Sequence, residues 1–453
     1  MDSVSTVKKG TASVDSGRNH GQAMHDLAAE LFPICRSITG EGFRQSLKIL
    51  QRELPGLNAF EVPSGTQCFD WQVPREWNIR DAYIIDPEGR KIVDFKVCNL
   101  HVVGYSLPID QVMTLDALKP HLYSLPEQPD AIPYVTSYYT ERWGFCLTHN
   151  QLQTLQPGEY RVRIDSTLEP GHLTYGELLI PGERKEEVFV STYLCHPSMG
   201  NNELSGPVVA TELAKWVTGL PHRKYTYRFV FIPETIGSIV YLSRNIEALK
   251  RDVVAAFNVT CIGDERAYSF LPSRRGGTLS DRAALHALHH HAGEFIRYSY
   301  LVRGSDERQY CSPLVNLPMV SIMRSRYDTY PEYHTSKDDL SLITPAGLGG
   351  GFEALRKAVM SIEANRTYRA TMPCQPNLGK RGLYPTLSTK KTFEIVRSMV
   401  MTLDYCDGDH DLLSIAEMLD VPIWELSPVA QTLEDHGLLE LLDQSEGAPA
   451  DGR

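Results

Sequence analysis

The sequence predicts an α/β fold in which a mixed, mainly parallel sheet is covered by helices, with an inserted small β-rich domain and a C-terminal winged-helix domain. Between residues 173 and 372, strand-like runs such as EEVFVSTYL and YTYRFVFI alternate with helix-like runs such as GPVVATELAKWV, a pattern typical of parallel sheets. Between residues 67 and 172 the runs become short and β-branched, and turn residues such as DPEG separate them. The segment DLLSIAEMLDVPIWELSPVAQTLEDHGLLEL has the helix, turn, helix and short strand of a winged helix.

These patterns divide the chain into four regions. Residues 1–20 are polar and are expected to form a disordered tail. Residues 21–66 and 173–372 are assigned to the α/β core, and residues 67–172 to the β-rich insertion. The Pro- and Gly-rich link MPCQPNLGKRGLYPT leads to the winged-helix-like domain at residues 375–445. Ligands of such sheets bind at the carboxyl ends of the strands, so functional residues are expected there.

Composition and charge exclude several classes of protein. The chain has 453 residues and a net charge of -11, which argues against a general binder of nucleic acid or anionic membranes. Its polar start predicts no secretory leader, and no apolar run approaches the length of a membrane span. The nine cysteines are scattered and form no C-x-x-C pair, as in a reduced protein. We therefore expect a cytoplasmic location.

Candidate functional residues follow the strand-like runs of the core. His196 follows VFVSTYL, Glu234 follows RFVFI, His334 lies in a loop after VSIM, and Glu203 lies seven positions beyond His196. Imidazoles and carboxylates bind zinc, and a carboxylate not bound to the metal can accept a proton from the attacking water. The pattern predicts His196, Glu203 and His334 as ligands and Glu234 as general base. The alternative is a set of ordinary loops, with packing or capping histidines and a solvated Glu203.

Several segments resemble a known family. HPSMGNNELSG, FIPETIGS and YHTSKDDL are similar to the metal-site motifs of the zinc exopeptidases, which include leucyl aminopeptidases, glutaminyl cyclases and glutamate carboxypeptidase. Over residues 25–445 the chain more closely resembles bacterial aminopeptidase-like proteins of polysaccharide and natural-product gene clusters. That resemblance rests on CRSITGEG, YYTERWGFC, GSDERQYCSP and LGKRGLYPT taken together. It implies an aminopeptidase-like activity on a small biosynthetic substrate.

The chain departs from the zinc exopeptidase pattern at three ligand positions. Asn202 stands where the family has an aspartate that bridges two zinc ions, Thr235 where it has a glutamate, and Thr260 where it has an aspartate. Neutral side chains do not offset the charge of two close divalent cations. We therefore expect one zinc ion per chain, held by the three ligands named above.

The segment GSDERQYCSP, residues 304–313, supplies further candidates. Asp306 is a candidate ligand, supporting carboxylate or substrate-binding group, and Arg308 could hold a substrate carboxylate in a bidentate manner. The alternative is a salt-bridged loop. Asn202 and Tyr330 are also substrate-binding candidates, although core or rim packing is the favoured interpretation of Tyr330. The four histidines of DRAALHALHHHAGEF are interpreted as a solvated helix face, because no carboxylate from another segment obviously joins them.

The predicted function is zinc-dependent, aminopeptidase-like hydrolysis of a small amide, a peptide, or an aminoacyl or N-acyl biosynthetic intermediate. One alternative is an inactive scaffold or a winged-helix regulator built on a degenerate core, suggested by the lost ligand positions. Another is an amide-forming or cyclising enzyme that uses the same site. Residues 398–452 contain no Lys or Arg, so we expect no nucleic-acid partner, because phosphate contacts need cations. No membrane partner is expected, and a homo-oligomer is left open.

Overall fold

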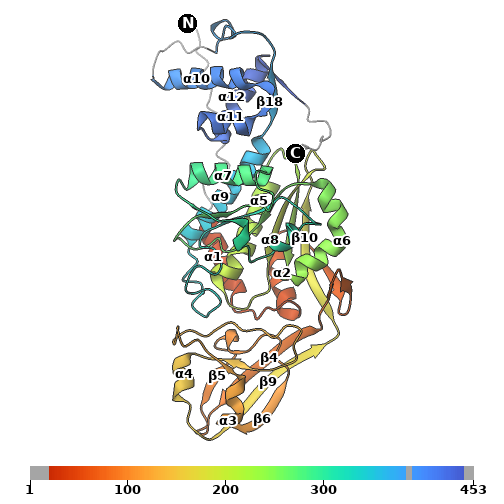
Figure 1. Cartoon of the computed structure of the whole chain (residues 1–453), viewed down its shortest axis with the longest axis vertical. Helices are drawn as coiled ribbons and strands as arrows, with labels where there is room; N and C mark the ends of the chain where they lie inside the picture. Colours follow the sequence, from red (N-terminus) through yellow and green to blue (C-terminus); the bar gives the residue numbers. More distant parts are fainter. Residues whose placement is uncertain (1–19, 384–389, 443–453) are drawn as a thin grey trace, which may run out of the picture.

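The computed structural model describes residues 20–383 and 390–442, so the tail predicted for residues 1–20 lies outside the described residues except for His20. Figure 1 shows three units in a row, with the α/β core in the middle, the insertion at one end and the winged-helix unit at the other. Within the described ranges, no helix combines the length and apolar character needed to cross a membrane.

The core is built on an eight-stranded sheet in the order β1-β10-β12-β11-β13-β16-β14-β15. Its centre, from β12 to β16, is parallel, whereas β1, β10 and β14 each pair antiparallel with a neighbour. This confirms the predicted mixed, mainly parallel sheet. The strands are β1 (Asn58–Pro63), β10 (His172–Ile180), β11 (Glu187–Tyr193), β12 (Thr226–Ile232), β13 (Val253–Asn258), β14 (Ser269–Leu271), β15 (Ile296–Arg297) and β16 (Met319–Met323).

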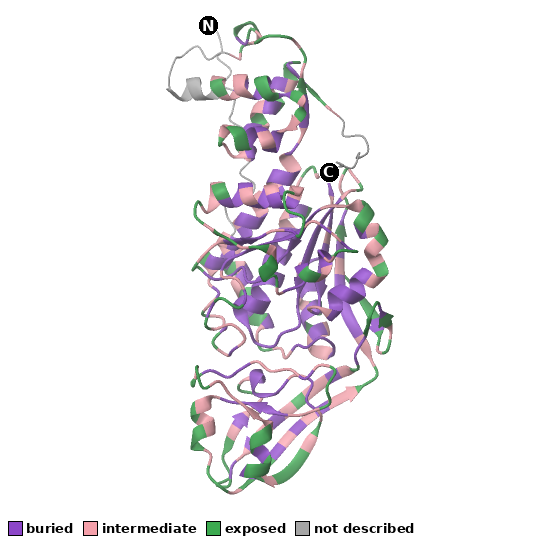
Figure 2. Cartoon of the chain, viewed as in Figure 1, coloured by how far each residue is buried: buried purple, intermediate pink, exposed green. Residues whose placement is uncertain are grey.

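Helices cover both faces of this sheet, and for that reason every residue of β11 is buried. Helices α1, α2, α5, α7 and α9 share one hydrophobic cluster, while α6 and α8 pack on the opposite face. Figure 2 shows the buried residues concentrated in the strands and on the facing sides of these helices. The helices are α1 (His20–Leu31), α2 (Glu41–Glu53), α5 (Ser205–Thr218), α6 (Ile236–Asp252), α7 (Leu279–His291), α8 (Glu307–Tyr310) and α9 (Pro345–Ala364).

The insertion is a separate antiparallel sheet in the order β5-β4-β9-β6 with its own hydrophobic cluster. In β9, Tyr160, Val162 and Ile164 are buried, whereas Arg161 and Arg163 between them are not, as expected for a sheet with one solvated face. The β-rich prediction is therefore confirmed. The elements are β2 (Gln67–Cys68), β3 (Trp71–Gln72), β4 (Glu76–Ile85), β5 (Lys91–Asp94), β6 (Ile109–Thr114), α3 (Leu115–Leu118), β7 (Leu122–Tyr123), β8 (Phe145–Cys146), α4 (His149–Thr154) and β9 (Glu159–Glu169).

The winged-helix unit contains α10 (Lys390–Tyr405), α11 (Leu412–Leu419), α12 (Ile423–Asp435) and a three-stranded sheet. The sheet is formed by β17 (Thr367–Ala370), β18 (Asp407–Asp411) and β19 (Leu439–Leu441). Strand β17 lies in the region assigned to the core, so the unit begins a few residues before the predicted boundary. Its partners are about 40 and 70 positions away in the chain, and local sequence patterns carry no information on such pairing.

This unit docks on helices α7 and α9 of the core. The guanidinium of Arg282 in α7 donates to both carboxylate oxygens of Asp411, at 2.8 and 2.7 Å. His286 Nε2 accepts the backbone N–H of Ile423, the first residue of α12, at 2.9 Å. Burial, with the neighbouring histidines, lowers the pKa of His286 to about 4, so the ring is a neutral acceptor.

The interpretation of this histidine group as a solvated helix face is therefore wrong. His286 is only 4% exposed. A carboxylate from the winged-helix unit also joins the group, because His289 Nε2 lies 2.8 Å from Asp420 Oδ1. The contacting groups are more than 130 positions apart, so only tertiary structure brings them together.

Candidate active site

The loops at the carboxyl ends of β11, β12 and β16 bring the predicted residues to one edge of the sheet. His196 lies three residues after β11, Glu234 two residues after β12, and His334 in the longer loop after β16. Since these strands are parallel and adjacent to one another or to β13, their ends meet at the same side of the core.

His196 lies between two carboxylates. Its Nδ1 is 2.7 Å from Glu203 Oε2, and its Nε2 is 3.6 Å from Glu234 Oε2. The side chain is buried, which by itself disfavours the charged imidazolium. Cys195 and Glu203 nevertheless raise the pKa of His196 well above its usual value. The ring is thus held through Nδ1 and presents Nε2 to Glu234.

Glu203 reaches His196 because the chain makes a single π-helical turn, Gly200–Leu204, before α5 begins. The side chain is fully buried, so the alternative of a solvated loop carboxylate is wrong. Its second oxygen, Oε1, has no hydrogen-bond partner in the described part of the chain and lies 3.8 Å from Arg36 Nε. Arg36 also donates to the backbone carbonyls of His196 and Leu31. Sequence reasoning missed Arg36, although it lies in the quoted CRSITGEG segment.

Glu234 is held from the other side by the segment that follows residue 303. The Ser305 hydroxyl donates to Glu234 Oε1 at 3.1 Å, which leaves Oε2 facing His196. Burial raises the pKa of Glu234, although His196 and Ser305 oppose part of this rise. The carboxylate remains 23% exposed, so a substrate can reach it.

Asp306 anchors the backbone just after Glu234. Its Oδ1 accepts the N–H of Thr235 at 2.7 Å and the hydroxyl of Ser238 at 2.9 Å. The backbone of Thr235 has φ 63° and ψ -74°, a conformation that costs free energy for any residue other than glycine. Burial and the nearby Glu234 raise the pKa of Asp306 to about 8. The guanidinium of Arg308 donates to Thr235 Oγ1 at 2.7 Å and is otherwise exposed beside this turn.

His334 faces His196 across the site, with ring centroids 5.6 Å apart. Its ring stacks on Tyr333 at 3.9 Å, and its Nε2 has no hydrogen-bond partner among the described residues. Burial and the neighbouring His196 lower the pKa of His334 to about 3, so the imidazole is neutral. A neutral, unpartnered nitrogen of this kind is ready to bind a cation.

The insertion closes one side of the site through Tyr134. The Tyr134 N–H donates to the carbonyl of His334 at 2.9 Å, and its ring lies 5.1 Å from His196 and 5.2 Å from His334. The sequence offered a weak signal, the aromatic run AIPYVTSYY, but nothing in it indicates contact with a loop 200 residues away.

Asn202 and Tyr330 lie in a buried network next to the histidines. Asn202 Nδ2 donates to the hydroxyl of Tyr193, and its Oδ1 has no partner in the described ranges. Tyr330 donates to Asp338 Oδ2 at 2.9 Å, and that carboxylate also accepts the Asn202 N–H. Thr260 contacts the Tyr193 hydroxyl at 2.5 Å. Tyr330 therefore helps to shape the turn that carries Asn202 and Glu203, and it points into the protein.

The site contains imidazole nitrogens and carboxylate and amide oxygens of the kinds that bind divalent cations. Buried potential ligand atoms at the site that lack hydrogen-bond partners among the described residues include His334 Nε2, Asn202 Oδ1, Glu203 Oε1 and Asp306 Oδ2. Potential ligand atoms of Cys195, His196 and Glu203 lie within 4.8 Å of one another, whereas His334 stands outside that tight group. The Thr235 hydroxyl already accepts from the guanidinium of Arg308, and the Thr260 hydroxyl is already bonded to that of Tyr193.

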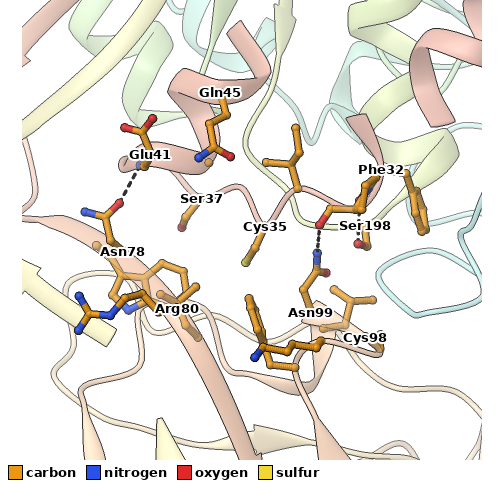
Figure 3. A pocket seen from close by; sticks show the side chains of 18 of the residues that line it. Phe32, Cys35, Ser37, Glu41, Gln45, Asn78, Arg80, Cys98, Asn99 and Ser198 are labelled. Carbon is orange, nitrogen blue, oxygen red and sulfur yellow. Dashed lines mark hydrogen bonds between the residues drawn. The ribbon is translucent and has the colours of Figure 1, made fainter. Parts of the chain in front are cut away.

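A cavity of about 1020 Å³ lies between the core and the insertion (Figure 3). Ser198 and Ser336, from the two histidine loops, contribute to its wall, but the catalytic candidates do not. Ser198 donates to the carbonyl of Phe32, and Asn78 accepts from the N–H of Glu41, as the dashed lines show. Much of its polar wall is thus already hydrogen-bonded, and the cavity marks where the insertion packs on the core.

The chain matches protein families that are already described. Residues 25–365 match the model of a family described as a domain of unknown function, DUF4910. The chain belongs to this DUF4910 family. Residues 366–441 of this DUF4910 protein match a winged helix-turn-helix model. This confirms the predicted terminal domain.

Proteins similar to this DUF4910 protein have peptidase-related names. A Clostridium acetobutylicum protein, named for polysaccharide biosynthesis and for an aminopeptidase-like domain, is 43% identical over 431 residues, covering 95% of this chain and 98% of the relative. A crystal structure of a C. acetobutylicum protein described as a peptidase matches with a TM-score of 0.88 and 43% identity, covering 93% of this chain and 96% of that one. A zinc aminopeptidase from Bacillus subtilis matches with a TM-score of 0.55 and 14% identity, covering 76% and 94%. The last match shows the fold alone, and that fold is aminopeptidase-like.

Proposed function

We propose that this protein is an aminopeptidase-like amidohydrolase whose centre binds one zinc ion. One observation carries the proposal: His196 is fixed through Nδ1 by a buried carboxylate, presents Nε2 to Glu234, and faces a second, neutral histidine with a free nitrogen. In metal sites, a histidine ligand commonly donates its other N–H to a carboxylate, which orients the ring.

His196 and His334 would hold the ion, and the carboxylate of Glu203 would support it through His196. The sequence-based prediction that Glu203 is itself a ligand requires its unpartnered Oε1 to reach the ion. The amide oxygen of Asn202 is a neutral oxygen available at the same side. A bound zinc ion would supply polarisation of a carbonyl and acidification of water.

Glu234 is the general base of the proposed reaction. Its Oε1 is occupied by Ser305, so Oε2 accepts the proton of the attacking water and returns it to the leaving nitrogen. The raised pKa of Glu234 suits both transfers, because the ideal pKa of an acid–base group lies near the working pH. The products are a carboxylate and an amine. Tyr134 and Tyr333 cover His334 and limit the access of bulk water there.

The substrate we propose is a small biosynthetic amide, such as an aminoacyl or N-acyl compound. The name of the 43% identical relative supports a biosynthetic role. Arg308, exposed beside Glu234, suits an anionic group near the scissile amide. An amide-forming or cyclising reaction would use the same residues, so product analysis separates these reactions.

A DNA-binding role receives less support from the structure. In helix-turn-helix proteins, the start of the recognition helix contacts the bases. Here the first residue of α12, Ile423, donates to His286 of the core, and Trp424 packs against His286 and His290. Charged residues along α12 are only acidic. We therefore propose that the winged helix stabilises the enzyme and binds no nucleic acid.

Metal analysis of the purified protein tests the proposed centre. We expect about one zinc per chain in the wild type, and loss of most of it in His196→Ala and His334→Ala. His222→Ala is the matched control, because that histidine is exposed and precedes β12, whereas Glu234 follows the opposite end of that strand. Zinc that stays bound in both site variants would contradict the proposal. Activity is measured on an aminoacyl p-nitroanilide and, through acetate release, on N-acetylhexosamines.

A further inference from the structure

A second pocket, of about 470 Å³, lies beside the β2–β3 hairpin where the chain passes from the core to the insertion. We propose that this pocket binds a saccharide of one or two units. We further infer that the pocket holds the sugar part of the amide substrate, and this extension rests on the proposed function. The inference that the pocket binds a saccharide does not depend on the proposed function.

Two aromatic rings stand open at this pocket. Trp71 is 42% exposed and Tyr139 is 52% exposed, and their rings meet edge to face with centroids 5.8 Å apart. The Tyr139 hydroxyl donates to the carbonyl of Gln72, which ties the ring to the hairpin. Large rings usually gain stability by burial, so two that are fixed yet exposed indicate a surface for a ligand with an apolar face.

The backbone is strained where it presents these rings. Tyr139 has φ 62°, and Phe69, in the turn of the hairpin, has φ 54°. Neither residue is a glycine, and the left-handed region costs free energy for bulky side chains. Strain that the fold maintains at an exposed aromatic pair points to a binding function for that pair.

Polar side chains surround the rings in the pattern that a sugar needs. Asp70 and Thr140 line the pocket, and their side chains have no hydrogen bond within the described residues. Arg75 and Glu141 form an exposed ion pair at the same pocket. A carboxylate offers two acceptor oxygens in one plane, and a guanidinium offers paired N–H donors in one plane. Either arrangement matches two neighbouring hydroxyl groups of a sugar.

A pyranose has both features, because its C–H face is apolar and its rim carries hydroxyl groups. The volume suits one or two such rings, since pockets for small ligands start at roughly 300 Å³. A purely apolar peptide segment would leave Asp70, Arg75 and Glu141 unused. The two carboxylates would repel a polyanion.

The pocket is connected to the candidate active site through aromatic contacts. Tyr105, in the pocket wall, packs edge to face on Tyr138 at 5.1 Å. The Tyr138 hydroxyl lies 3.1 Å from that of Tyr134, which covers both catalytic histidines. One segment, residues 131–141, therefore lines the saccharide pocket at one end and the active site at the other. A ligand at Trp71 would sit next to the segment that positions Tyr134.

Binding is tested by titrating the full-length protein with N-acetylglucosamine, chitobiose and cellobiose, followed by tryptophan fluorescence and saturation-transfer NMR. We expect saturable binding of at least one sugar, weakened at least 10-fold in Trp71→Ala and several-fold in Asp70→Asn. Tyr405→Ala removes an exposed aromatic ring in the winged-helix unit and is the matched control, expected to bind like the wild type. Thermal unfolding verifies that each variant is folded.

Three results would overturn the proposal: no saturable binding of any of these sugars, equal weakening in Tyr405→Ala, or unchanged affinity in Trp71→Ala. Trp71-dependent binding of trialanine in place of the sugars would show a peptide site instead. Glu234→Gln and His196→Ala separate this inference from the proposed function, because both should still bind the sugar. Sugar binding without any amide hydrolysis would leave the saccharide site standing and remove the hydrolase.

Discussion

Replacing Glu203 by Gln removes a buried negative charge and preserves the shape of the side chain. Glu203 is fully buried, contacts His196 at 2.7 Å and lies 3.8 Å from the buried guanidinium of Arg36. At 3.8 Å and an effective dielectric constant of 20, two unit charges interact by about 4 kcal/mol. Breaking one side of a buried pair typically costs about 3–5 kcal/mol, because the remaining charge stays buried. We expect Glu203→Gln to lower the free energy of unfolding by about 3–5 kcal/mol.

The assay is urea-induced unfolding of protein from which metal has been removed with a chelator. Tryptophan fluorescence follows the unfolding transition of the α/β core. Glu30→Gln is the matched control, since Glu30 pairs with Arg52 at the surface, where the loss should stay below about 1 kcal/mol. In the double variant with Arg36→Met, the loss should fall short of the sum of the two single losses by at least about 1 kcal/mol. Additive losses, or a Glu203→Gln loss no larger than that of Glu30→Gln, would refute the buried ion pair. Zinc affinity should also fall about 10–100-fold in Glu203→Gln.

Three further outcomes follow from the same structure. Glu234→Gln should keep its zinc and lose roughly 100-fold or more of any amidase activity, and loss of zinc in this variant would make Glu234 a ligand. Burial lowers the pKa of Lys224 to about 7, whereas its pKa in the unfolded chain is 10.5. Between these two pH values the unfolded chain binds more protons than the folded protein, so the free energy of unfolding should rise with pH. Lys224→Met should flatten this rise in unfolding curves measured from pH 7 to 10, and an unchanged slope would refute the assignment. Truncation after Asn365 should expose the faces of α7 and α9 and give a less stable or aggregating core, while a mobility-shift titration at low salt should show no DNA binding by either form. Salt-sensitive binding that disappears on truncation would support the regulator instead.

The sequence alone determined the classes of structure and the positions of the main candidates. The alternation of VFVSTYL, RFVFI and the helices between them is a local signal of a parallel sheet, and the structure confirms it. The carboxyl ends of such strands meet at one edge of the sheet, so the sequence predicts that His196, Glu234 and His334 lie there. The winged helix was also predictable from the sequence, because its helices bury one face at a period of 3.6 residues.

Tertiary structure alone decided how these groups are used. Glu203 could be either solvated or inward, and the π-helical turn before α5 made it the buried partner of His196. The cover supplied by Tyr134 and the docking of His286 on Ile423 join segments more than 130 residues apart. Local periodicity records only which side of an element is apolar. Which partner meets that side depends on packing and chain connectivity over the whole fold, and no window of sequence contains that information.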